Sequence, residues 1–177
     1  GLLVHKSARI EYHPLGVIGV ICPWNFPLQN VLAPAIPAIM AGNAALVKVS
    51  EWTAWSAARI QRIFDEALRA EGHSADLVQL ITGYAPTGAA LVAAGVDKIV
   101  FTGSMANGKR VLAASAETLT PVILELGGKD PMIVCDDADL QQAVHNALVG
   151  TLTSAGQLCM AAELEDDGGQ GLGAGGE

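Results

Sequence analysis

Cys159 is the residue of this 177-residue chain whose setting best fits a nucleophile. It follows the pair Gly156 and Gln157, which breaks the predicted helix before it, and a cysteine at such a turn can be partly exposed. A nearby dipole would favour the thiolate, which is the reactive form of the side chain. Composition alone favours the other interpretation, a small hydrophobic residue in the core.

Two further side chains could assist such a thiol. Asn25 stands between Trp24 and Phe26 with a proline on either side, and a rigidly held amide is a good donor to a developing oxyanion. Its alternative is an asparagine that forms a turn. Glu125 lies in an apolar run just before a glycine pair, where a carboxylate can act as a general base. Its alternative is a buried glutamate hydrogen-bonded to the backbone.

Other residues suggest a site for an anion and a sugar. Residues 101–109, FTGSMANGK, indicate a strand, a glycine turn and a helix that Ser104 can cap, so that the helix N-terminus could receive an anion. A plain helix cap explains the same residues, and the GxGxxG spacing of a standard dinucleotide fingerprint is absent. Lys48 and Glu51 could bond to ribose hydroxyls, or form a solvated charge pair at a strand end.

The elements that must position these residues alternate along the chain. Short apolar runs predict strands over 16–21, 44–49, 77–81, 98–102, 121–126 and 131–135, and most are continuous enough for burial on both faces. Longer patterns predict helices over 28–41, 53–70, 86–94, 105–115 and 140–153. This alternation predicts an α/β fold, a Rossmann-like open parallel sheet with flanking helices. Ligands of such sheets bind beyond the carboxyl ends of the strands, where most of the residues above fall.

Composition excludes several classes of partner. The net charge is −8, and five of the 18 acidic residues lie in residues 163–177, so the remainder is nearly balanced and nucleic acid is not expected. The longest apolar stretch, residues 31–47, is interrupted by prolines and is not expected to span a membrane. No signal peptide is evident, so we expect a cytoplasmic protein. Cys22, Cys135 and Cys159 have no metal-type spacing, which predicts reduced thiols and no metal site.

Five motifs in this order and spacing resemble the NAD(P)-dependent aldehyde dehydrogenase superfamily: PWNFP, KVSE, FTGS, LELGGK and GQLC. The resemblance extends from Tyr12 to Ala162. It implies oxidation of a small-molecule aldehyde to a carboxylic acid, with Cys159 as the nucleophile. Asn25 and the backbone N–H of Cys159 would then hold the oxyanion of a thiohemiacetal, and Glu125 would activate the water that hydrolyses a thioester.

The same resemblance implies a binding site for NAD. Glu51 favours NAD over NADP because a carboxylate at the ribose disfavours a 2′-phosphate, although NADP remains possible. The identity of the aldehyde stays open. The cofactor-binding residues implied by the resemblance are Trp24, Lys48, Glu51, Gly83, Gly88, Gly103 and Ser104.

The resemblance ends just after Ala162. We therefore expect residues 1–162 to be the cofactor-binding domain with the catalytic cysteine at its end, and residues 163–177 to be an acidic, glycine-rich, disordered tail. Family members form homo-oligomers through a segment that this sequence is not expected to contain. The alternative function is an inactive, truncated fragment that at most binds a dinucleotide or an intact subunit.

Overall fold

The computed structural model describes residues 6–163 and divides the chain into two compact units, Gly1–Glu125 and Leu126–Glu177. The five-stranded sheet is formed by β1 (Val17–Ile21), β2 (Ala44–Lys48), β3 (Val78–Ile81), β4 (Lys98–Gly103) and β5 (Val122–Leu126). The strand order is β3-β2-β1-β4-β5, and β1 runs parallel to both β2 and β4. The order reverses direction at β1, as in doubly wound sheets, so the predicted fold class is confirmed.

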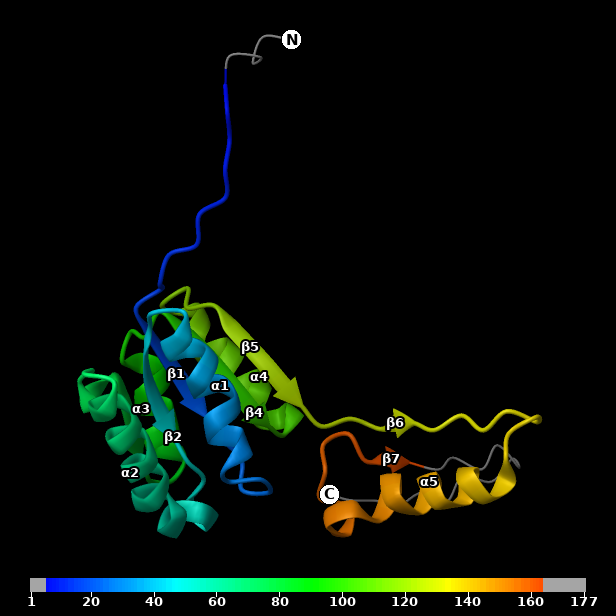
Figure 1. The fold of residues 1–177 in the computed structure, drawn as a ribbon. Helices are drawn as coiled ribbons and strands as arrows, with labels where there is room; N and C mark the ends of the chain where they lie inside the picture. The colour runs from blue at the N-terminus through cyan, green and yellow to red at the C-terminus, as the bar shows by residue number, and fades with distance from the viewer. Residues whose placement is uncertain (1–5, 164–177) are drawn as a thin grey trace. The chain divides into compact units, whose positions relative to one another are not determined.

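Four helices connect these strands: α1 (Gln29–Met40), α2 (Ala54–Ala70), α3 (Ala85–Ala93) and α4 (Met105–Ala116). In Figure 1, α1 and α2 cover one face of the sheet, and α3 and α4 cover the other. Two short 3₁₀ turns, η1 (Glu51–Thr53) and η2 (Ala75–Leu77), precede α2 and β3. All four helices and five strands of the first unit lie within about two residues of their predicted bounds.

The core explains why these segments form helices and strands. α2 buries Ala57, Ile60, Phe64 and Leu68, which recur every three or four residues on one face of the helix. Three consecutive residues of β1 are buried, as expected for a strand covered on both faces. β5 differs, because its residues alternate between half-buried and exposed, as in a strand with only one face covered. Burial on both faces, which was expected for most of the strands, therefore holds for β1 and does not hold for β5.

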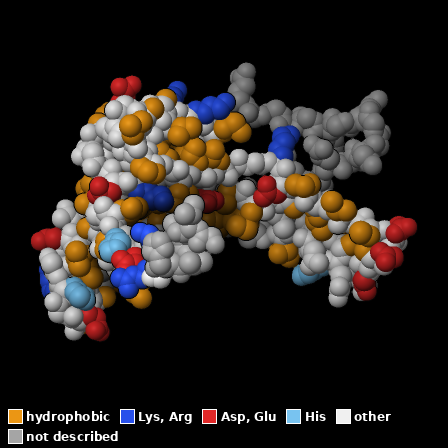
Figure 2. Space-filling model, turned by 90° about the horizontal axis from the view of Figure 1, so that it is seen from above, with side chains coloured by type: hydrophobic (Ala, Val, Ile, Leu, Met, Phe, Trp, Pro, Cys, Tyr) orange, Lys and Arg blue, Asp and Glu red, His pale blue; other side chains and the backbone are white. Residues whose placement is uncertain are grey.

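The second unit contains β6 (Asp130–Pro131), α5 (Leu140–Leu152), the 3₁₀ turn η3 (Thr153–Gly156) and β7 (Ala162–Glu163). β6 pairs with β7, and Asp139 caps α5 by accepting a hydrogen bond from the Gln142 N–H at 3.0 Å. Hydrophobic side chains are exposed along this unit (Figure 2), and α5 has no buried residue.

Two predictions concern this unit. The strand predicted over 131–135 is wrong beyond Pro131, because only β7 pairs with this segment among the described residues and it is two residues long. The tail predicted to be disordered lies outside the described residues, except for Glu163 in β7. Within residues 6–163, no helix has the length and apolar character needed to cross a bilayer.

Candidate active site

Most of the predicted site residues lie at the edge of the sheet formed by the carboxyl ends of the strands. Backbone pairing continues just past these ends: the Cys22 N–H donates to the Lys48 carbonyl at 2.9 Å, and the Val49 N–H donates to the Ile81 carbonyl at 3.1 Å. The loops that follow therefore start side by side. Two of the predicted residues end strands of the sheet, and the others lie in the loops or short helical segments that follow: Lys48 and Gly103 end β2 and β4, and the others are Trp24, Asn25, Glu51, Gly83, Gly88 and Ser104.

Lys48 and Glu51 form the most strongly structured part of this edge. The Lys48 side chain is only 7% exposed, and its Nζ lies 3.4 Å from Oε2 of Glu51. The Ser50 hydroxyl lies 3.4 Å from the same oxygen and also accepts a hydrogen bond from the Trp52 N–H. A solvated charge pair, the alternative interpretation, therefore does not describe Lys48. A nearly buried ammonium beside a carboxylate can bind vicinal hydroxyls.

The pKa of Glu51 is lowered from its ordinary value of 4.5. The largest cause is a hydrogen bond from its own backbone N–H, and the positive charge of Lys48 adds to it, while partial burial acts in the opposite direction. Glu51 is thus ionised at neutral pH, which suits an acceptor for hydroxyl groups and repels a phosphate.

The glycines of this edge serve different purposes. Gly83 has a φ of +148°, and a Cβ there would collide with Thr87, while a Cβ on Gly103 would come within 2.8 Å of the Phe101 ring. Backbone conformation and packing therefore explain these two. At Gly88 a Cβ would meet no described atom within 4 Å, although the residue is half-buried. The space beside the first turn of α3 is therefore open, and a ligand could approach the backbone there.

Ser104 caps the start of α4. Its Oγ accepts a hydrogen bond from the Asn107 N–H at 3.4 Å, and its carbonyl accepts one from the Gly108 N–H at 2.9 Å. The helix has twelve residues, so its N-terminus carries the partial positive charge that attracts a pyrophosphate. Together with Lys48, Glu51 and the space at Gly88, this donor set fits a dinucleotide.

Asn25 lies in the loop between β1 and α1 and is half-buried. Its Oδ1 accepts a hydrogen bond from Nδ2 of Asn30 at 3.2 Å. The side chain also lines one part of an open groove of roughly 740 Å³. The remaining lining residues are almost all apolar: Phe26, Pro27, Leu28, Gln29, Leu32, Ala33, Ile36 and Pro37.

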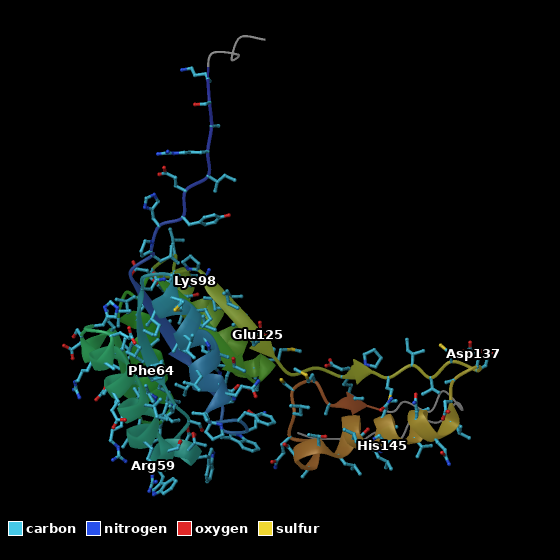
Figure 3. All side chains as sticks on the ribbon, viewed as in Figure 1. Arg59, Phe64, Lys98, Glu125, Asp137 and His145 are labelled. Carbon is cyan, nitrogen blue, oxygen red and sulfur yellow. The ribbon has the colours of Figure 1, made fainter. Side chains whose placement is uncertain are left out.

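Glu125 is exposed at the end of β5 (Figure 3), so the buried glutamate considered as its alternative is not observed. Cys159 lies in the second unit, just after η3, and its side chain is exposed, so it is not a core residue either. Three consecutive residues before it, from Ser154 to Gly156, have φ between 53° and 74°. This left-handed turn ends α5, and a hydrogen bond from the Ala161 N–H to the Leu158 carbonyl at 3.0 Å closes the turn around Cys159.

Asn30 and Ser50 are the residues of this edge that the sequence did not single out. Ser50 lies inside the KVSE motif and contacts Glu51, so the motif was a signal for it. Asn30 lies in the first turn of α1, five residues after Asn25, and no motif marks it. No group of three or more potential metal ligands occurs in the part of the chain that the structure describes.

Comparisons with known proteins identify the family to which the chain is similar. Residues 4–164 match the model of the aldehyde dehydrogenase family. The chain is 44% identical over 153 residues to a mitochondrial benzaldehyde dehydrogenase of Antirrhinum majus, covering 85% of this chain and 28% of the relative. It is 40% identical over 159 residues to a coniferyl aldehyde dehydrogenase of a Pseudomonas species, covering 88% and 31%.

Solved structures similar to this chain are also aldehyde dehydrogenases. The NAD⁺ complex of an aldehyde dehydrogenase from Bacillus cereus superimposes with a TM-score of 0.77 at 38% identity, covering 85% of this chain and 30% of that one. The chain thus spans about a third of the length of the relatives that it matches.

Proposed function

The chain belongs to the aldehyde dehydrogenase family, and from this premise we propose that it provides the NAD-binding domain and the nucleophile of an enzyme that oxidises an aldehyde to a carboxylic acid. The observation that carries the proposal is the buried Lys48 paired with Glu51 at the carboxyl edge of a doubly wound sheet. This edge is where such sheets bind nucleotides. Residues 1–162 form the proposed domain.

Different residues at the carboxyl edge of the sheet bind different parts of the dinucleotide. Lys48 and Glu51 hold the adenosine ribose, the backbone at Trp24 contacts the cofactor, and Gly83 and Gly88 leave room on the adenine side. Gly103 and Ser104, at the start of α4, hold the pyrophosphate. The ionised Glu51 favours NAD over NADP. When bound, NAD supplies the acceptor for the hydride that leaves the substrate carbon.

The protein's own groups carry the remaining steps. The Cys159 thiolate adds to the aldehyde carbon and forms a C–S bond, while the carbonyl electron pair moves onto oxygen. The Asn25 amide and the backbone N–H of Cys159 donate hydrogen bonds to this oxyanion. Loss of the hydride leaves a thioester. Glu125 then takes a proton from water, and the resulting hydroxide attacks the thioester carbon. The C–S bond breaks, which frees the carboxylic acid and regenerates the Cys159 thiolate.

An apolar aldehyde is the substrate class that the groove beside Asn25 favours. Its lining is almost entirely hydrocarbon, with few groups to bond a polar substituent. Two of the relatives are named for benzaldehyde and coniferyl aldehyde, both of which are aromatic aldehydes.

The test is NADH formation from a panel of aromatic and aliphatic aldehydes, with NAD affinity measured by calorimetry. We expect turnover by the unaltered protein, no turnover by Cys159→Ala and the same affinity for NAD in both. Turnover that survives in Cys159→Ala would refute the assigned nucleophile. NAD binding without any turnover would instead support the alternative function, a dinucleotide-binding fragment without catalysis.

A further inference from the structure

The first turn of α1 contains an unusual carbonyl group. In an uninterrupted helix the carbonyl of Asn30 would accept a hydrogen bond from the N–H of the residue four positions later. That residue is Pro34, which has no N–H and whose ring crowds the carbonyl. The Asn30 carbonyl accepts a hydrogen bond from the Cys22 thiol instead, at 3.1 Å.

Cys22 is well suited to this role. It lies buried directly after β1, and burial raises the pKa of its thiol to about 12, against the opposing charge of Lys48. The sulfur therefore keeps its proton at physiological pH and remains a donor. The bond joins the end of β1 to the start of α1 and holds Asn30 at a defined place.

The side chain of Asn30 then reaches back to Asn25. Its Nδ2 donates to Oδ1 of Asn25 at 3.2 Å, and both residues are half-buried. An amide has an acceptor at one end and two donors at the other. With its oxygen turned toward Asn30, the Asn25 amide has its NH₂ group at the opposite end.

We propose that Asn30 is a positioning residue that sets the amide of Asn25 with its NH₂ group as the donor to the oxyanion. The inference rests on the proposed function, since it concerns the oxyanion formed at the aldehyde carbon. Asn30 does not itself contact the reacting atoms. Its effect on catalysis passes through Asn25, and this separates it from a residue that merely supports the loop.

A double-mutant cycle tests this separation, with kcat as the readout. In the full chain, Asn30→Leu removes the donor, and we expect kcat to fall about tenfold, which corresponds to one net hydrogen bond of about 1.4 kcal/mol. Asn30→Asp offers only acceptor oxygens, so it should turn the amide around, and kcat should fall nearly as far as in Asn25→Ala, by about a hundredfold. In the Asn25→Ala background, neither change at residue 30 should lower kcat further.

Several readouts distinguish this role from general damage. NAD affinity and the KM for NAD should be unchanged in the Asn30 variants, and melting curves identify any variant that fails to fold. Asn146→Leu, the same change at an exposed position of α5, is the control and should leave kcat unchanged. Additive losses in the Asn25→Ala background would overturn the role of Asn30 while leaving the proposed function in place. An unaltered protein that forms no NADH with any aldehyde would overturn the proposed function itself, and with it the role of Asn30.

Discussion

The two units of the chain hold their functional groups in different ways. In the first unit, Lys48 ends a strand that lies inside the core, and the helix that follows it buries four side chains. In the second unit, Cys159 is exposed after a helix that buries none, although Leu140, Val144 and Leu148 are all exposed hydrophobic residues on it. The proposed binding groups thus rest on a core within their own unit, and the proposed nucleophile, Cys159, does not. Binding and reactivity should therefore respond separately to substitution.

Backbone strain shows the same contrast. In the first unit, most residues with a positive φ are glycines. In the turn before Cys159, Ser154 and Ala155 also have a positive φ. Each of these costs roughly 1–2 kcal/mol relative to a right-handed conformation. Such strain persists where the surrounding structure holds it, and it is frequent beside functional residues.

The largest expected effect is on the free energy of unfolding, and it tests whether the hydrophobic core lies in the first unit. Phe64→Ala should lower the free energy of unfolding by about 3–5 kcal/mol, because Phe64 is 4% exposed and its removal leaves a cavity. Leu148→Ala, on α5, should change it by less than about 0.5 kcal/mol. Urea denaturation of both variants measures the difference. A large loss in Leu148→Ala would show that the exposed face of α5 is covered in solution, and the contrast between the units would fail.

A smaller effect is expected for cofactor binding. Lys48→Met should raise the Kd for NAD about ten- to a hundredfold, because it removes a nearly buried donor beside Glu51 and leaves the carboxylate without its ion pair. Arg69→Met, which removes an exposed cation at the end of α2, is the matched control and should leave the Kd unchanged. Calorimetry with NAD gives both values. If Lys48→Met bound NAD as tightly as the unaltered protein, Lys48 would have no part in NAD binding, and the main support for the proposed function would be lost.

The sequence predicted the sheet well because the relevant signals are local. Continuous apolar runs identify the central strands, and the spacing of Ile60, Phe64 and Leu68 identifies α2. The strand predicted over 131–135 failed because a strand also needs a partner, and the apolar run cannot show whether one is present. Only Asp130 and Pro131 find one among the described residues.

The candidate site was less accessible to prediction. Motifs located Lys48 and Glu51, but the near-complete burial of the Lys48 side chain depends on its neighbours in the folded sheet, which the KVSE motif does not contain. Asn30 was missed because its role depends on a thiol eight residues earlier and an amide five residues earlier. Pro34 inside a helical pattern was the available signal, since it leaves a carbonyl without its usual donor.

Gly88→Ala should separate binding from stability within the first unit. Alanine is the better helix former by about 1 kcal/mol, and no described atom opposes its Cβ, so the free energy of unfolding should rise by up to that amount. The same Cβ would occupy the space beside α3 that we assign to the adenine side of NAD, and the Kd should rise severalfold. Melting curves and calorimetry measure the two effects. A variant that binds NAD normally would show that this space is not part of the site.

The smallest expected effect concerns the pH dependence of the Lys48–Glu51 pair. Because the pKa of Glu51 is lowered in the folded protein, its carboxylate stabilises the fold at pH values above its ordinary value of 4.5, and this contribution is lost as the pH falls through the lower, folded-state value. Glu51→Gln should therefore be less stable than the unaltered protein at neutral pH, and the difference should shrink in acid. The side chain is 35% exposed, so solvent screening keeps the difference below about 1 kcal/mol.

Urea denaturation at a series of pH values measures this difference, with Glu71→Gln, an exposed carboxylate at the end of α2, reporting the effect of net charge alone. A difference that grows in acid would have the wrong sign for a carboxylate stabilised by its own backbone N–H and by Lys48. The buried ammonium would then be held by the core without help from Glu51, and the contrast with the second unit would come from packing alone. A difference that disappears in acid would show that charge as well as packing holds the proposed ribose-binding pair in place.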